Sequence, residues 1–126
     1  MAGFDEVLAW LLEDDCSLTR YNSLIFLLGR PLHDSEVIDS LSQMLNTTPI
    51  LDILSRQQPD GGYETKASLK KYRRTVEYPG YLPKYKASTW EALFLAQASV
   101  PPNDPRIQAL GEYLLEKVYS REHGPD

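Results

Sequence analysis

The chain has 126 residues, of which 42% are hydrophobic and 25% are charged, and its formal net charge is −5. This length suits one domain, and the composition suits a folded globular chain and excludes general disorder. The longest apolar run, Leu24 to Leu28, is far too short to span a membrane.

Apolar residues at helical spacing predict three amphipathic helices in the first half of the chain. They cover about residues 4–13, 18–28 and 34–45. Ser17 is the predicted cap of the second helix, Gly29 ends it, and Pro31 prevents its continuation. The third helix begins at Asp34 or Ser35.

Three more helices are predicted in the second half, at about residues 50–57, 88–97 and 104–119. The first follows Thr48-Pro49, which places proline in the opening turn. The second starts at Ser88-Thr89-Trp90-Glu91, which has the pattern of a capping box. The third starts at Asp104-Pro105. No segment shows sustained alternation of period two, so we expect one all-α domain over residues 1–126.

Residues 59–86 form the one long predicted connection. This stretch contains Gly61-Gly62, Pro79-Gly80 and Pro83, together with five of the eight tyrosines. Long connections in compact domains are commonly functional.

The segment RQQPDGGY at 56–63 contains Gln57, Gly61 and Tyr63 at the spacing Gln, three residues, Gly, one residue, aromatic. This pattern resembles the repeat of the squalene cyclase and protein prenyltransferase superfamily, in which Trp stands at the place of Tyr63. Gly61 and Gly62 allow a positive φ after the helix, and the aromatic ring can fold back onto the helix ends.

Three further segments resemble successive parts of bacterial cyclase-like proteins of this superfamily, whose function is mostly unassigned. They are WLLEDDCSLTRYNSLIFLLGRP, LPKYKASTWEALFLAQ, which contains Trp90, and DPRIQALGEYLLE. The resemblance covers nearly the whole chain and implies an α/α toroid, in which antiparallel helical hairpins form an inner and an outer ring. About six helices are fewer than such a ring needs, so we expect a partial toroid.

A partial ring leaves apolar helix faces uncovered. The last residues, Gly124-Pro125-Asp126, echo Gln58-Pro59-Asp60, so the chain is expected to be a short relative or an N-terminal piece of a longer protein. Another copy of the chain, or the remainder of a longer one, is the expected partner of these faces.

The catalytic motifs of the resembled superfamily are not matched. Glu13-Asp14-Asp15 fails the spacing of the cyclase acid motif, because Leu12 stands where its first Asp would be. Asp14-x-Cys16 matches part of the prenyltransferase zinc site, but His33 and His123 stand in no matching motif, and zinc needs at least three protein ligands. The sequence therefore predicts no catalytic residue, metal or cofactor, and it favours a non-enzyme.

Cys16 is the only cysteine and can form no disulfide within the chain. A lone cysteine fits a reducing compartment, and MAGFDEV shows no basic region ahead of an apolar one. We expect a cytoplasmic protein with no membrane span, in which Cys16 is a half-buried packing residue.

Seven of the thirteen cations lie between Lys66 and Lys86, against one acid, Glu77, so the rest of the chain is acidic. Two oppositely charged surfaces are expected. Cations interleaved with tyrosines suit a diphosphate or a single-stranded nucleic acid. The candidate anion-binding residues are Lys70, Lys71, Arg73, Arg74, Lys84 and Lys86.

Other interpretations of this segment stay open. A solvated loop that faces the chain's own acidic surface and an acidic protein partner both explain its charge, and the negative net charge argues against nucleic acid. Aromatic residues at its end are candidates for an apolar pocket, or for ordinary packing. They are Tyr81, Tyr85, Trp90 and Phe94.

Three hypotheses follow for function. The first is a non-catalytic helical repeat module of cyclase-like type that binds itself or a partner. The second is an isoprenoid-binding protein or a cyclase-like enzyme fragment, in which the basic segment holds a diphosphate. The third is binding of an anion or of single-stranded nucleic acid through residues 66–86.

Overall fold

The computed structural model describes residues 3–13, 15–76, 79 and 87–119. Every regular element in these ranges is helical, so the predicted all-α class is confirmed. None of these helices combines the length and the hydrophobicity that crossing a bilayer requires. Several residues singled out in the sequence lie outside the described ranges, namely Asp14, Tyr81, Lys84, Tyr85, Lys86 and His123.

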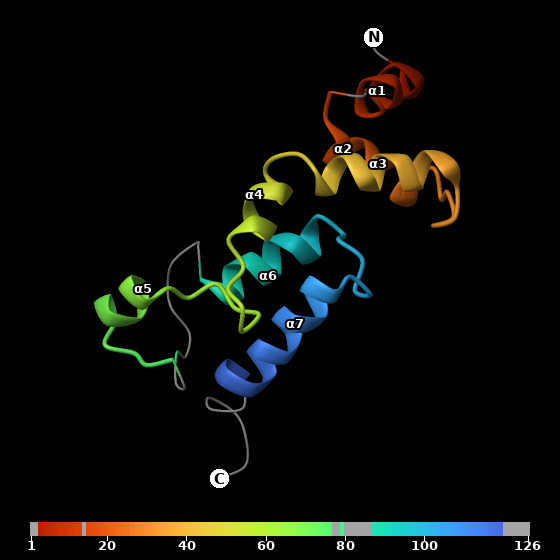
Figure 1. The fold of residues 1–126 in the computed structure, drawn as a ribbon. Coiled ribbons are helices and arrows are strands. Elements are labelled where there is room, and N and C mark those ends of the chain that lie inside the picture. Colours follow the sequence, from red (N-terminus) through yellow and green to blue (C-terminus); the bar gives the residue numbers. More distant parts are fainter. Residues whose placement is uncertain (1–2, 14, 77–78, 80–86, 120–126) are drawn as a thin grey trace. The chain divides into compact units, whose positions relative to one another are not determined.

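The chain forms two compact units, Met1–Ile53 and Leu54–Asp126, which Figure 1 shows in sequence colours. The boundary between them falls within α4 (Ile50–Ser55). The single domain and the toroid expected from the sequence stay predictions.

The first unit is built on α2 (Ser17–Phe26) and α3 (Ser35–Leu45), which pack against each other. Both helices supply fully buried apolar side chains, namely Tyr21, Leu24, Val37 and Met44. Gly29 has φ of +60° and ends the segment after α2 as predicted. Asp34 caps α3, because its carboxylate accepts hydrogen bonds from the backbone N–H groups of Glu36 and Val37 at 3.0 and 3.2 Å.

Two details of the first unit differ from the prediction. α1 (Phe4–Leu11) ends before Glu13, and it buries none of its residues. Ser17 is the first residue of α2 and not its cap, which is Cys16. The Ser17 hydroxyl lies 3.1 Å from the Thr47 hydroxyl, so a tertiary contact uses the oxygen that a cap would need.

The second unit contains α5 (Lys66–Lys71), α6 (Ser88–Gln97) and α7 (Pro105–Tyr113), which continues into a π-helical turn (Leu114–Tyr119). α6 and α7 pack together (Figure 1). Their buried apolar side chains include Leu95, Leu110 and Tyr113. Asp104 caps α7 through the backbone N–H of Arg106 at 2.9 Å, with Pro105 following, as the sequence indicates.

A short helix lies inside the predicted long connection. α5 has a capping box in which the Thr65 hydroxyl accepts from the N–H of Ser68 and the Ser68 hydroxyl accepts from the N–H of Thr65. Leu69 is the only residue of this six-residue helix that is buried. Because a helix with one buried position has no apolar periodicity, the sequence pattern does not reveal it.

The capping box predicted at Ser88 to Glu91 is wrong. Ala87 is the N-cap of α6 and its side chain makes no capping bond. Ser88 and Glu91 are both buried and bind partners from outside the helix, Glu64 and Arg56. Charged partners give stronger hydrogen bonds than the neutral amides of a helix end, so the tertiary contacts prevail.

Candidate functional site

The turn at residues 57–63 is held against α7 by the side chain of Gln57. Its amide nitrogen Nε2 donates to the carbonyl oxygen of Gly61 and to that of Arg106, both at 2.9 Å. The carboxylate of Asp60 accepts from the N–H of Gly62 at 3.0 Å, which closes the turn. Gln57 therefore links the turn to the first residues of α7.

Gly61 and Gly62 allow the turn to approach α7 closely. Gly61 has φ of +93°, and a Cβ there would lie 2.4 Å from the carbonyl oxygen of Ala109. A Cβ at Gly62 would lie 2.4 Å from the ring of Tyr113. Both positions require glycine, the first for its backbone conformation and its contact, the second for its contact.

Tyr63 is buried next to a charged pair. Its backbone N–H donates to the Ser88 hydroxyl at 2.7 Å, and the Arg56 guanidinium lies 6.0 Å from the centre of its ring. Arg56 donates to the carboxylate of Glu91 at 2.7 Å. Burial, and to a smaller degree the charge of Glu91, raises the pKa of Tyr63 to about 12. The buried hydroxyl of Tyr63 has no hydrogen-bond partner among the described residues.

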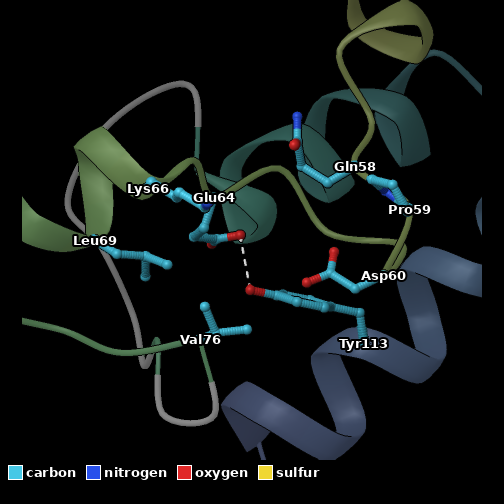
Figure 2. Close-up of a pocket in the computed structure, with 8 residues that line it drawn as sticks. All are labelled: Gln58, Pro59, Asp60, Glu64, Lys66, Leu69, Val76 and Tyr113. Carbon is cyan, nitrogen blue, oxygen red and sulfur yellow. Dashed lines mark hydrogen bonds between the residues drawn. The ribbon is translucent and has the colours of Figure 1, made fainter.

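Glu64 connects three parts of the second unit, as Figure 2 shows for one of its contacts. Its carboxylate accepts from the Tyr113 hydroxyl at 3.0 Å, from the backbone N–H of Ser88 at 3.1 Å, and from the Ser88 hydroxyl. Burial, followed by the charge of Glu64, raises the pKa of the Tyr113 phenol. Glu64 thus acts on the start of α6 much as a capping residue would, although it lies 24 residues away in the sequence.

A pocket of about 270 Å³ lies beside this network (Figure 2). Its lining comes from the turn, from α5 and the residues around it, and from α7: Gln58, Pro59, Asp60, Glu64, Lys66, Leu69, Val76 and Tyr113. Glu64 and Tyr113 already bond each other here, so these two groups hold the fold together. No group of three metal-ligating side chains occurs in the described ranges.

The candidate anion-binding residues that the structure describes lie together on α5 and directly after it. Lys70, Lys71, Arg73 and Arg74 are all exposed. With the exposed Lys66 they form a group that we call the α5 basic cluster. Within the described part of the chain, no carboxylate forms an ion pair with any of these five cations, whereas Arg56 and Arg106 pair with Glu91 and Asp104.

The predicted aromatic pocket stays a prediction, because Tyr81 and Tyr85 lie outside the described residues. Trp90 is half-buried and Phe94 is 39% exposed, and neither lines a described pocket. An apolar groove of about 220 Å³, which we call the α6/α7 groove, occurs nearby. Its lining is Ala92, Leu95, Ala96, Val100, Pro102, Ile107, Leu110, Gly111 and Leu114. The small residues at 92, 96 and 111 are the signal that could have revealed it.

The first unit exposes large apolar side chains. On α1, Phe4 is 66% exposed, Val7 44% and Trp10 67%. Further exposed apolar residues of this unit are Phe26, Leu27, Leu32, Ile38 and Leu51. The three exposed residues of α1 recur every three positions and so share one side of the helix, and an exposed apolar side commonly marks a binding face.

Cys16 is exposed, so the expectation of a half-buried residue is wrong. Its sulfur lies 3.1 Å from the Thr19 hydroxyl at the start of α2. The surrounding pocket of about 550 Å³ is lined by residues 15–18, Gln43 and 46–49. His33 is exposed, which matches its position in a polar turn.

Comparison with known proteins provides no relative: no family model matches this chain, and no curated protein or solved structure does.

Proposed function

We propose that the chain is a non-catalytic helical module of squalene cyclase-like type that associates with further copies of itself. The observation that carries this proposal is the exposed apolar side of α1. Phe4, Val7 and Trp10 follow each other at intervals of three residues, and none of them is buried. A helix with an uncovered apolar side gains stability mainly when another surface covers that side.

The free energy gained by burying the exposed apolar side chains of α1 is large enough to favour association. Burying one large apolar side chain contributes about 1.5–3 kcal/mol relative to leaving it in water. Phe4 and Trp10 are each about two-thirds exposed, so covering both of them favours association by about 2–4 kcal/mol.

The cyclase-like part of the proposal is supported by the turn at 57–63. Gln57 bonds the neighbouring helix, the two glycines pack on that helix, and Tyr63 is 5% exposed. An aromatic residue that pointed into water would argue against the resemblance to the superfamily repeat.

Sedimentation equilibrium tests self-association. We expect the weight-average mass to rise above the 14.4 kDa of one chain as the concentration increases. Val7→Glu places a charge on the apolar side of α1 and should weaken association. Ala9→Glu adds the same charge at another exposed position of α1 and is the matched control. A constant mass of one chain at all concentrations would contradict the proposal.

The α5 basic cluster supports a second candidate function, the binding of a phosphate-bearing ligand. Five exposed cations without a carboxylate partner in the described ranges form an electrostatic site for anions. Thermal-shift measurements with farnesyl diphosphate and with tripolyphosphate test this candidate. We expect the ligand to raise the melting temperature, and we expect this rise to become smaller with added salt and in the double variant Arg73→Glu plus Arg74→Glu. If the double variant showed the same rise as wild type, the α5 basic cluster would not be the binding site.

A further inference from the structure

We propose that the α5 basic cluster binds a linear chain of phosphate groups, which lies across its exposed surface. This inference rests on the second candidate function, the binding of a phosphate-bearing ligand, and names the class of that ligand. Three observations support it: the local charge of the segment, the way its cations are distributed, and the surroundings of its one aromatic residue.

The segment at residues 65–76 is strongly positive. It contains five cations and no acidic residue, and all five cations are exposed. At physiological salt, charges that lie more than about 8 Å apart are largely screened from each other. An anion close to this surface therefore responds mainly to the local cations, and much less to the net charge of −5 that the whole chain carries.

The cations of the cluster do not converge on a pocket. Of the three pockets described above, only the one beside Glu64 is lined by a member of the cluster, Lys66. Asp60 and Glu64 line the same pocket, so a diphosphate bound there would face two carboxylates. The other four cations line none of the three: Lys70, Lys71, Arg73 and Arg74. Sites for small ligands are concave, so these four suit a ligand that extends over a surface.

The four cations are spread around the end of α5. Successive residues of an α-helix point about 100° apart, so Lys70 and Lys71 point to different sides. Arg73 has φ of +56°, and the N–H groups of Arg73 and Arg74 donate to the carbonyl oxygens of Lys70 and Leu69 at 3.1 and 2.8 Å. These are the two bonds of a Schellman motif, which fixes the backbone from which both arginines extend. A flexible chain of phosphates can contact cations on several sides, whereas one diphosphate contacts those on a single side.

Tyr72 is the only aromatic residue in residues 65–76, and it is half-buried. The ammonium nitrogen Nζ of Lys71 lies 5.8 Å from the centre of its ring. Proteins that bind single strands through the bases offer aromatic rings on which those bases stack. Because residues 65–76 offer no exposed ring, the cluster recognises the phosphates by their charge, and bases add little.

A series of ligands of different length tests the proposal. Isothermal titration calorimetry compares inorganic diphosphate, a polyphosphate of about ten phosphates, and a thymidine oligonucleotide of similar length. We expect both long ligands to bind about tenfold or more tightly than diphosphate, because they contact more cations. If four phosphates are neutralised, the affinity for the oligonucleotide should fall about fiftyfold between about 50 and 200 mM salt.

Lys70→Gln plus Lys71→Gln removes two cations of the cluster. Lysine and glutamine have nearly equal helix propensity, so α5 should be retained, which circular dichroism checks. We expect the fall in affinity over the same salt range to shrink to about sevenfold in this variant. Arg30→Gln plus Arg106→Gln is the matched control, because it removes two cations that already pair with carboxylates. The control should keep the full salt dependence.

The outcomes separate this inference from the second candidate function. Diphosphate that binds as tightly as the long ligands overturns the linear chain, while binding of a phosphate-bearing ligand would still stand. An oligonucleotide that binds where polyphosphate does not would show that bases carry the contact, which contradicts recognition by charge. Polyphosphate that binds alone would identify the free polymer as the source of the chain. Unchanged salt dependence in the lysine variant would place the site outside the cluster, and binding of none of the three ligands overturns the inference together with the candidate function.

Discussion

Gly61 and Gly111 are both glycines beside or within α7, but the structure assigns them opposite roles. Gly61 combines φ of +93° with a position that would put a Cβ 2.4 Å from a backbone oxygen. Gly111 lies in regular helix with open space around it. Substitution by alanine should therefore change the free energy of unfolding in opposite directions at the two positions.

We expect Gly61→Ala to lower the free energy of unfolding by about 2–4 kcal/mol, since both the backbone and the contact with Ala109 are strained. Gly111→Ala should raise it by about 0.5–1 kcal/mol through the higher helix propensity of alanine. Urea unfolding followed by circular dichroism, at a dilution where the chain is monomeric, measures both values. Equal effects at the two positions would contradict the packing of the turn on α7.

Tyr63 provides a prediction about pH. Its pKa is raised from 10.0 to about 12 because the phenol is buried, so the folded state holds the neutral form more strongly than the unfolded chain does. The stability that this contributes is complete below pH 10 and is lost as the pH rises from 10 through 12. Tyr63→Phe removes this titration and also removes a buried hydroxyl that has no partner in the described ranges.

Wild type should therefore lose about 1 kcal/mol more than Tyr63→Phe between pH 8 and pH 11. At pH 8 the variant should be at least as stable as wild type. Urea unfolding at the two pH values measures the difference. A variant that is several kcal/mol less stable at pH 8 would show that the hydroxyl makes a bond essential to the fold.

At the scale of the elements, the ends of the helices are encoded in different ways. Asp34 and Asp104 cap α3 and α7 through residues two or three positions away, and both starts could be predicted from the sequence. Ser88 and Glu91 have the same kind of local pattern, but their side chains bind Glu64 and Arg56 instead. The sequence pattern alone does not reveal partners that lie 24 and 35 residues away.

Asp34→Ala should lower the free energy of unfolding of the first unit by about 1 kcal/mol, because two backbone N–H groups lose their acceptor. Asp34→Ser should recover most of this loss, since serine caps helices nearly as well as aspartate. Thermal unfolding of the three proteins followed by circular dichroism measures the ranking. If serine recovered nothing, the ion pair between Arg30 and Asp34, and not the cap, would be the stabilising contact.

At the scale of the whole molecule, the all-helical class followed from apolar periodicity because helices with one buried stripe repeat it over several turns. Tyr63 was singled out from its motif, and the structure buries it. Glu64, which joins Tyr113 and Ser88, follows no motif, and nothing in its neighbours in the sequence indicates those partners. The α6/α7 groove was missed for a similar reason, because two helices and the connection between them line it.

Self-association also predicts that stability depends on concentration. Any partner that binds only the folded chain raises the apparent free energy of unfolding in proportion to the logarithm of its concentration. The urea midpoint of wild type should therefore rise as the protein concentration increases, and that of Val7→Glu should not. Equal midpoints at all concentrations for both proteins would show that no folded copies associate in this range.

The central claim is that a second copy covers the apolar side of α1, and acrylamide quenching of Trp10 tests it most directly. Trp10 is 67% exposed in the single chain, and Trp90→Phe leaves it as the only tryptophan. We predict that its quenching constant falls at least twofold, with a blue shift of its emission, as the concentration rises from about 1 μM to about 1 mM. A quenching constant that stays at the exposed value across this range would contradict the claim.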